Sequence, residues 1–189
     1  MRKRRWSTWL GSALVIGGAA LLVWFGWTIH ERTVAQRRAK ELLNRAITVP
    51  RSAPAPRVHR GDVVGEIEIP RLHLAVIIFE GDDAGILKQG AGHIPGTALP
   101  SASGNIGIAA HRDTYFRPLH QIHPKDVITL KGPSGTSQYA VTETEIVKPS
   151  DVGVLQRAPG RDLTLVTCYP FYYVGNAPER FIVHARKIG

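Results

Sequence analysis

The segment from Trp6 to Ile29 contains no charged residue, although 21% of the chain is charged. At about 1.5 Å per residue, a helix of this length would extend roughly 36 Å, enough to cross the hydrocarbon core of a bilayer. All four tryptophans lie near its two ends, where amphipathic rings favour the lipid headgroups. A cleaved signal peptide is the alternative, but its apolar core would be shorter and no clear cleavage site follows. The pattern predicts a retained transmembrane helix over residues 6–29.

The net charge of +9 is concentrated beside this segment. Residues 1–60 carry 12 Lys and Arg against 2 acidic residues, whereas residues 61–189 carry 12 against 13. A nucleic-acid-binding domain needs its basic excess on the folded part, so this distribution argues against nucleic acid as a partner. Basic residues flank both ends of the apolar segment, so charge alone gives a near tie for orientation. The compact basic cluster in residues 1–5 favours a cytoplasmic tail and a single-pass plasma-membrane protein with its domain outside.

Residues 30–57 are predicted to form a stalk and a linker. Apolar residues recur at helical spacing through 31–47, which predicts a juxtamembrane helix with one apolar stripe. Pro50, Pro54 and Pro56 then predict an extended linker, because proline cannot continue a helix. A separate domain is therefore expected over residues 58–189.

The sequence from Val58 onward consists of short β-branched runs separated by Gly, Pro and Asp, which is typical of a compact all-β domain. Residues 81–92 are predicted to hold one helical turn at most, and 148–162 a long loop anchored by Val152, Val154 and Leu155. The predicted strands are Val64–Ile69, Leu74–Phe79, Asn105–Ala110, Val127–Leu130, Gln138–Val147, Leu163–Cys168 and Arg180–Arg186.

The single cysteine, Cys168, ends one of these predicted strands. It cannot form an intramolecular disulfide, so in an outward-facing domain it is a free thiol. Because Pro170 follows closely and proline cannot extend a central strand, we expect the thiol at a sheet rim, where a substrate can reach it. An inert buried cysteine is the alternative, and the residue alone does not decide between the two.

Two further residues at strand ends supply the groups that a thiol nucleophile needs. His111 ends the apolar run 105–110, and histidine is the usual general acid and base near neutral pH. Arg180 opens the last predicted strand, and a forked guanidinium can stabilise an oxyanion, although a surface ion pair with Glu179 is the simpler alternative. A free thiol is only about 3% thiolate at pH 7, so a neighbouring cation would activate it.

These residues stand in an order that resembles the sortase family. The family signature Thr-Leu-x-Thr-Cys matches residues 164–168, its histidine after a Gly/Ala-rich strand matches His111, and its downstream arginine matches Arg180. The resemblance covers roughly residues 61–189. The segments His-Ile-Pro-Gly-Thr-Ala-Leu-Pro at 93–100 and Cys-Tyr-Pro-Phe at 168–171 are most similar to class D. The usual Gly-Asp before the strand that follows the histidine is Lys125-Asp126 here, which we expect to alter only a turn.

This resemblance implies an eight-stranded β-barrel with short helices and a two-step acyl transfer. Cys168 would attack the threonine carbonyl of a Leu-Pro-x-Thr-Gly/Ala sorting signal, His111 would protonate the leaving amine, and an amine acceptor of the envelope would resolve the thioester. Arg180 would stabilise the oxyanion or hold the substrate backbone. The implied partners are substrate proteins with a C-terminal sorting signal, and no cofactor is implied. A lid motif of the Asp-Pro-aromatic type, common in pilin-polymerising sortases, is not found in the sequence.

Other candidates carry weaker signals. His120 and His123 are three residues apart without an evident third zinc ligand. Glu80, Asp82 and Asp83 could bind calcium, but an acidic turn is the simpler interpretation. His184 is expected to be structural, His93 to border the site, and Thr167 to face away from Cys168. A different cysteine acyl-transferase and an anchored envelope binding domain with an unreactive thiol are the competing functions.

Overall fold

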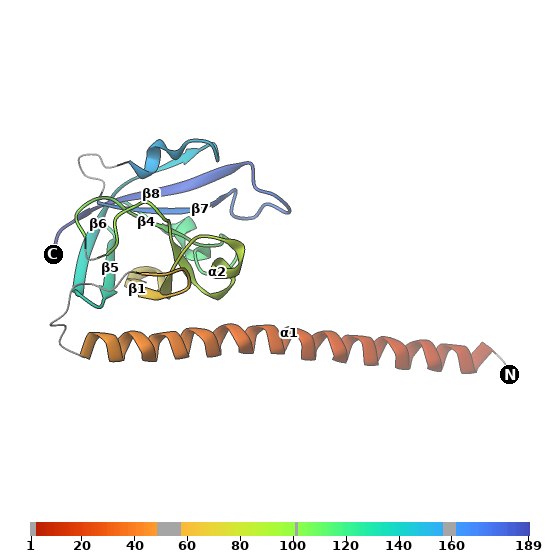
Figure 1. Ribbon diagram of the computed structural model, residues 1–189. Coiled ribbons are helices and arrows are strands. Elements are labelled where there is room, and N and C mark those ends of the chain that lie inside the picture. The colour runs from red at the N-terminus through yellow and green to blue at the C-terminus, as the bar shows by residue number, and fades with distance from the viewer. Residues whose placement is uncertain (1–2, 49–57, 101, 157–161) are drawn as a thin grey trace.

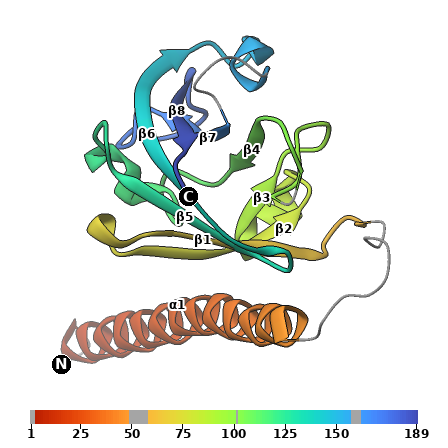
Figure 2. The ribbon, with the colours of Figure 1, turned by 90° about the vertical axis from the view of Figure 1, so that its left-hand side faces the viewer.

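The domain folds as a closed β-barrel in the computed structural model, which describes residues 3–48, 58–100, 102–156 and 162–189. Its eight strands follow the order β1-β2-β3-β4-β7-β8-β6-β5, and a long helix, α1, lies alongside β1 and β2 (Figures 1 and 2). The predicted all-β domain and the eight-stranded barrel are thus confirmed.

The strands lie close to their predicted positions. Seven predicted runs coincide with strands to within three residues at each end. The strands are β1 (Val63–Ile69), β2 (Leu74–Glu80), β3 (Ala91–His93), β4 (Ile106–Ala109), β5 (Val127–Gly132), β6 (Gly135–Val147), β7 (Leu163–Tyr169) and β8 (Glu179–Lys187). The α-helices are α1 (Lys3–Thr48) and α2 (Ala84–Gln89), and the short 3₁₀ helices are η1 (Pro70–Leu72), η2 (Arg117–Gln121) and η3 (Val152–Leu155).

The segment 81–93 differs from the sequence-based expectation. It holds the six-residue helix α2, longer than the single turn predicted, and the short strand β3, which was not predicted. Asp83 caps α2 by accepting hydrogen bonds from the backbone N–H groups of Gly85 and Ile86. A side chain at Gly92 would come within 2.2 Å of the Gly81 carbonyl oxygen, so glycine permits this close approach of chains.

Two other turns explain features of the sequence. Lys125 has a φ of 74°, a conformation that glycine adopts most readily, and it lies at the position where the family commonly has glycine. The departure at Lys125 therefore lies in a turn.

In the long segment 148–162, η3 buries Val154 against the domain, whereas the predicted anchor Val152 is exposed.

The barrel interior is filled mainly by β-branched and leucine side chains of the barrel strands. The alternation along each strand directs one set of apolar residues inward, and η2 closes part of the interior with Phe116 and Leu119. Fully buried members of this core include Ile67, Ile69, Ile78, Ile106, Ile108, Ile128, Leu163 and Leu165.

Helix α1 packs its C-terminal part against the outside of the barrel. Ala39 and Leu43 are buried among Ile77, Phe79 and Ile86. Part of the apolar stripe predicted for the stalk helix is therefore a packing face, whereas Leu42 of the same stripe is exposed. The predicted proline-rich linker falls on residues 49–57, outside the described part of the chain.

Polar contacts fix the same face of α1. The Gln36 side-chain oxygen accepts a hydrogen bond from the Ile77 backbone N–H at 2.9 Å, and its amide donates to the Gln89 carbonyl. Lys40 forms an ion pair with Glu66 at 2.6 Å, and this hydrogen bond raises the pKa of Lys40. These contacts set the rotation of the helix about its own axis.

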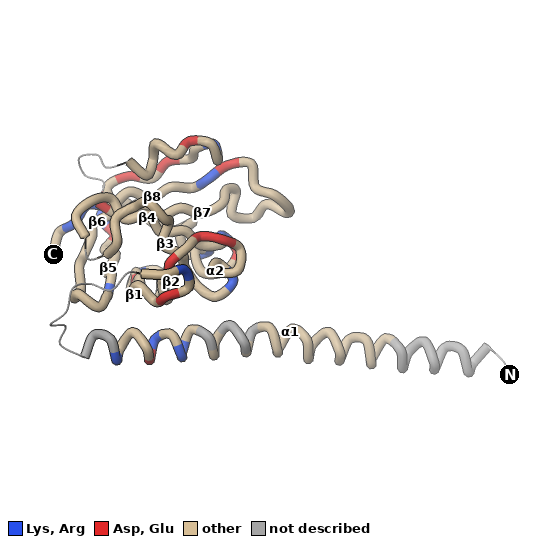
Figure 3. The backbone as a smooth tube through the Cα atoms, in the orientation of Figure 1, with Lys and Arg blue, Asp and Glu red and all other residues tan. Residues whose placement is uncertain are grey.

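Within the part of α1 that was predicted to span a membrane, the large apolar side chains between Leu14 and Trp27 are exposed. Leu14, Leu22 and Trp24 are 73%, 73% and 67% exposed, and the helix carries no charge in this region (Figure 3). Within the described residues, no helix contains a stretch long enough and apolar enough to count as a membrane span. The span over residues 6–29 stays a prediction.

We expect Leu43→Ala to lower the free energy of unfolding by about 2 kcal/mol or more, because it leaves a cavity between α1 and the barrel. Leu42→Ala is the matched control, since Leu42 is 58% exposed whereas Leu43 is 1% exposed. Thermal unfolding of the full chain in detergent micelles measures the difference. Equal melting temperatures for the two variants would show that the helix does not pack on the barrel in solution.

Candidate active site

The three predicted catalytic residues meet at one end of three neighbouring strands. Cys168 on β7 is the direct cross-strand partner of Arg180 on β8. On the other side of β7, the parallel strand β4 pairs Ala109 with Val166, and the Ala110 N–H donates to the Val166 carbonyl at 3.2 Å. Continuing this register two residues beyond the end of β4 would place His111 beside Cys168. The three residues therefore lie at the same end of these neighbouring strands.

These side chains are accessible without being fully exposed. Cys168, His111 and Arg180 are each half-buried, so the thiol is not fully enclosed in the core. The Arg180 guanidinium donates to the carbonyl oxygen of Glu179 at 3.0 Å, a contact within its own turn. Directly opposed residues of an antiparallel pair have Cβ atoms about 5 Å apart. The Arg180 guanidinium can therefore reach the carbonyl oxygen of an acyl group attached to the Cys168 sulfur. The arrangement can support acyl transfer through a thiol.

A threonine next to the cysteine ties the two active strands together. The Thr167 hydroxyl donates to the Ala110 carbonyl oxygen at 2.7 Å, and the side chain is 2% exposed. As predicted, it faces away from the rim and does not contact Cys168. Its partner was not predictable from the sequence, because 57 residues separate Thr167 from Ala110. It fixes the residue before His111 relative to the residue before Cys168.

The turn after Cys168 carries a cluster of aromatic rings. Phe171 packs edge-on against Phe181 with ring centroids 5.2 Å apart, and Tyr169 stacks on Phe181 at 6.4 Å. His120 contacts Phe171 and Tyr172, at 5.9 and 5.8 Å. The cluster gives the rim a shaped apolar wall, which the sequence analysis did not predict.

Comparison with known proteins agrees with this geometry. Residues 67–188 match the family model of the sortase domain. The chain belongs to the sortase family. It is 36% identical over 129 residues to Sortase D of Bacillus subtilis, covering 68% of this chain, and a sortase D5 transpeptidase of Clostridium perfringens has the same fold, with a TM-score of 0.73 and 26% identity over 82% of this chain and 99% of that one. The chain is thus a class D-like sortase.

The curated relatives are longer than the matched region. The match spans 65% of the Bacillus subtilis protein and 49% of Sortase A of Listeria monocytogenes. A sortase C of Clostridium perfringens, solved with the C-terminal cell wall sorting motif, is 28% identical with a TM-score of 0.65 and covers 84% of this chain and 90% of that one.

A buried polar network runs through β7, the strand that carries Cys168, in this sortase. Thr164, the first residue of the signature, hydrogen-bonds Asn105 on one side and the His184 Nδ1 on the other, at 2.9 and 3.1 Å. His184 is fully buried, and its Nε2 contacts Glu145 at 2.8 Å. The network joins β7 to β8, β6 and the residue before β4. His184 is therefore structural, as predicted.

The other histidines and acids of the sequence analysis have separate partners. His93 is 2% exposed, with Nδ1 at 2.7 Å from Glu80 and Nε2 at 3.0 Å from the Ala98 carbonyl, so it holds the loop before β4. Asp83 pairs with Arg60, whose hydrogen bond lowers the pKa of Asp83 below its usual range. Among the described residues, no cluster of three or more His, Cys, Asp or Glu could hold a metal ion.

His120 and His123 are not brought together on a common ligand. His120 contacts the aromatic turn, and its Nδ1–H donates a hydrogen bond to the Arg117 carbonyl oxygen at 2.7 Å. His123 lies beside Arg71, which pairs with Asp126, and this hydrogen bond lowers the pKa of Asp126. Each histidine therefore stabilises a different turn.

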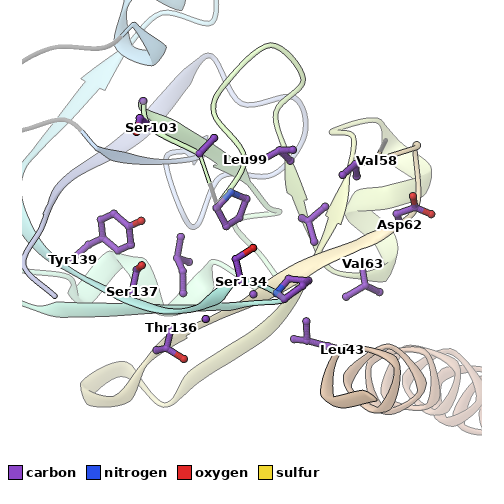
Figure 4. Close-up of a pocket in the computed structure, with 18 of the residues that line it drawn as sticks. Leu43, Val58, Asp62, Val63, Leu99, Ser103, Ser134, Thr136, Ser137 and Tyr139 are labelled. Atoms are coloured by element: carbon purple, nitrogen blue, oxygen red, sulfur yellow. The ribbon is translucent and has the colours of Figure 1, made fainter. Parts of the chain in front are cut away.

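A roomy cavity of about 870 Å³ lies at the opposite end of the barrel (Figure 4). Asp162 precedes β7 and Lys187 ends β8, so this cavity opens where those strands are farthest from Cys168. Burial raises the pKa of Tyr139, one of its lining residues. The cavity is separate from the candidate site, because the predicted catalytic residues are not among the residues that line it.

Proposed function

We propose that this sortase is a cysteine transpeptidase that cleaves a Leu-Pro-x-Thr-Gly/Ala sorting signal after threonine and transfers the acyl group to an amine. The observation that carries the proposal is the pairing of Cys168 with Arg180 across β7 and β8, with His111 following β4 on the other side. A half-buried thiol flanked by a base and a forked cation is suited to acyl transfer.

In the first step, His111 takes the proton of the Cys168 thiol, and the sulfur forms a bond to the threonine carbonyl carbon. The carbonyl electrons move onto oxygen, where the Arg180 guanidinium stabilises the negative charge. When the tetrahedral intermediate collapses, the C–N bond breaks and His111 gives its proton to the leaving amine. The product of this step is a thioester between Cys168 and the substrate threonine.

In the second step, an amine attacks the thioester carbonyl. A new C–N bond forms, the C–S bond breaks, and His111 accepts the proton that the amine loses before returning it to the departing sulfur. Water can replace the amine and give hydrolysis. The Clostridium perfringens sortase C with its C-terminal cell wall sorting motif supports this class of substrate.

The test is the reaction itself. The full chain in detergent micelles is incubated with a sorting-signal peptide and glycylglycine, and the mixture is analysed by mass spectrometry. We expect the peptide to be cut after threonine, an acyl adduct on Cys168, and a transfer product joined to glycylglycine. An intact peptide with no adduct would instead favour an envelope binding domain with an unreactive thiol.

We also propose that α1 anchors this sortase in the plasma membrane, with the basic N-terminus in the cytoplasm and the barrel outside. The exposed apolar side chains between Leu14 and Trp27 support this, because a contiguous exposed apolar surface marks a site that contacts a membrane or another protein. We expect the full chain to stay with the membrane fraction during alkaline carbonate extraction, as spanning helices do. Release into the supernatant would contradict a spanning anchor.

A further inference from the structure

A cleft beside the proposed active site is lined by two arginines and by the turn between β7 and β8. Arg112 follows His111 directly, and the turn residues 171–175 begin three positions after Cys168. Arg117 and Asp113 complete the charged lining. The cleft therefore adjoins the proposed active site along the chain, although Cys168, His111 and Arg180 do not line it.

Arg112 holds this turn with one nitrogen of its guanidinium, and a second nitrogen has no partner among the described residues. Its Nη2 donates to the carbonyl oxygens of Tyr173 and Gly175, at 2.8 and 2.9 Å, and its guanidinium carbon lies 5.9 Å from the Tyr173 ring centre. Its Nη1 is buried and has no hydrogen-bond partner within the described parts of the chain. Leaving a buried charged donor unpaired is costly, and native structures seldom do so. An acceptor on a ligand would complete the site, and it reaches Nη1 only when the surrounding turn shifts, because this nitrogen is sealed from solvent in the structure.

The charges of the cleft specify the ligand. Arg117 and Asp113 are both exposed, so with Arg112 the cleft presents two cations and one anion. A guanidinium binds a carboxylate through short, charge-assisted hydrogen bonds, and two of them outweigh the single carboxylate of Asp113. Asp113 can in turn attract an ammonium group. A small molecule with both a carboxylate and an amine matches this pattern.

We propose that this cleft binds the carboxylate of the amine acceptor through Arg112 and Arg117, so that the preferred acceptor is an amino-acid-type amine. The inference rests on the transfer reaction proposed above. Binding the carboxylate holds the amine next to the Cys168 thioester, which raises its effective concentration over water. Transfer then competes better with hydrolysis.

The experiment compares two acceptors that differ in one group. The full chain in detergent micelles receives a sorting-signal peptide with either glycylglycine or glycylglycinamide, and chromatography gives the ratio of transfer to hydrolysis for each. Dividing one ratio by the other gives the carboxylate preference, and comparing this preference between variants cancels the intrinsic reactivity of the amines. The variants are Arg117→Gln, Arg112→Gln and the control Arg186→Gln, which replaces an exposed arginine at the far end of β8.

We expect the wild type to prefer glycylglycine. Arg117→Gln should reduce this preference about threefold to fivefold, as for an exposed ion pair, and Arg112→Gln about tenfold or more. Arg186→Gln should leave it unchanged. Arg112→Gln also removes the hydrogen bonds that hold the β7–β8 turn. The substitution at the exposed Arg117 is therefore the decisive one.

The outcomes separate this inference from the function on which it rests. A preference that is absent in the wild type, or the same in Arg117→Gln, overturns the carboxylate site while cleavage and transfer still support the transpeptidase. If the peptide is not cleaved at all, both proposals are overturned.

Discussion

Replacing Cys168 by alanine should abolish cleavage of a sorting-signal peptide, lowering the rate by roughly four orders of magnitude or more. The reason is that the proposed first step forms a bond to the sulfur, and the sequence contains no second cysteine that could replace it. Peptide cleavage by the full chain in detergent micelles, followed by chromatography, measures the effect.

The control for this variant is its thermal unfolding. Alanine at the rim removes one half-buried sulfur, so the melting temperature should change little. A thiol-directed electrophile, which can label only Cys168, should leave the alanine variant unlabelled. Undiminished turnover in a folded Cys168→Ala variant would contradict the proposed mechanism.

Arg180→Lys should lower the rate of cleavage about 100-fold to 1000-fold, even though the positive charge is kept. Lysine offers a point charge in place of a planar fork, so it cannot donate two fixed hydrogen bonds to an oxyanion. The loss should fall on kcat, with KM nearly unchanged, if Arg180 acts mainly in the transition state. Steady-state kinetics over a range of peptide concentrations distinguishes kcat from KM.

Arg186→Lys is the matched control for this substitution. Arg186 is an exposed residue on the same strand, β8, six residues beyond Arg180 and toward the opposite end of the barrel. Its replacement should leave both constants unchanged. Near-normal activity in Arg180→Lys would remove Arg180 from the catalytic site but would leave the role of Cys168 and the family membership intact.

Much of the barrel was predictable because its long strands repeat with a period of two. The strand 163–168, for example, was placed within one residue of β7. The short β3 was not predictable in this way, since three residues without a β-branched side chain carry no such signal. Helix α2 was underestimated because glycine lowers helix propensity, whereas the cap at Asp83 stabilises it locally.

The members of the candidate site stay a prediction, made from the residue types, strand-end positions and family order of Cys168, His111 and Arg180. The contacts around them were not predictable, among them the contact between Thr167 and Ala110 and the clamp of Arg112 on the β7–β8 turn. Both join residues more than 50 positions apart, and no local pattern encodes such a pair.

The sequence by itself determined the strand-forming runs, the uncharged N-terminal segment and the three candidate catalytic side chains, because each depends on residues close together in the chain. Only the tertiary structure decided that β4 and β8 flank β7, which brings His111 and Arg180 to either side of Cys168. It also decided that one face of α1 packs on the barrel, burying Leu43 while Leu42 stays exposed. Strand order and helix docking are set by which surfaces exclude water together, and that depends on the whole domain at once.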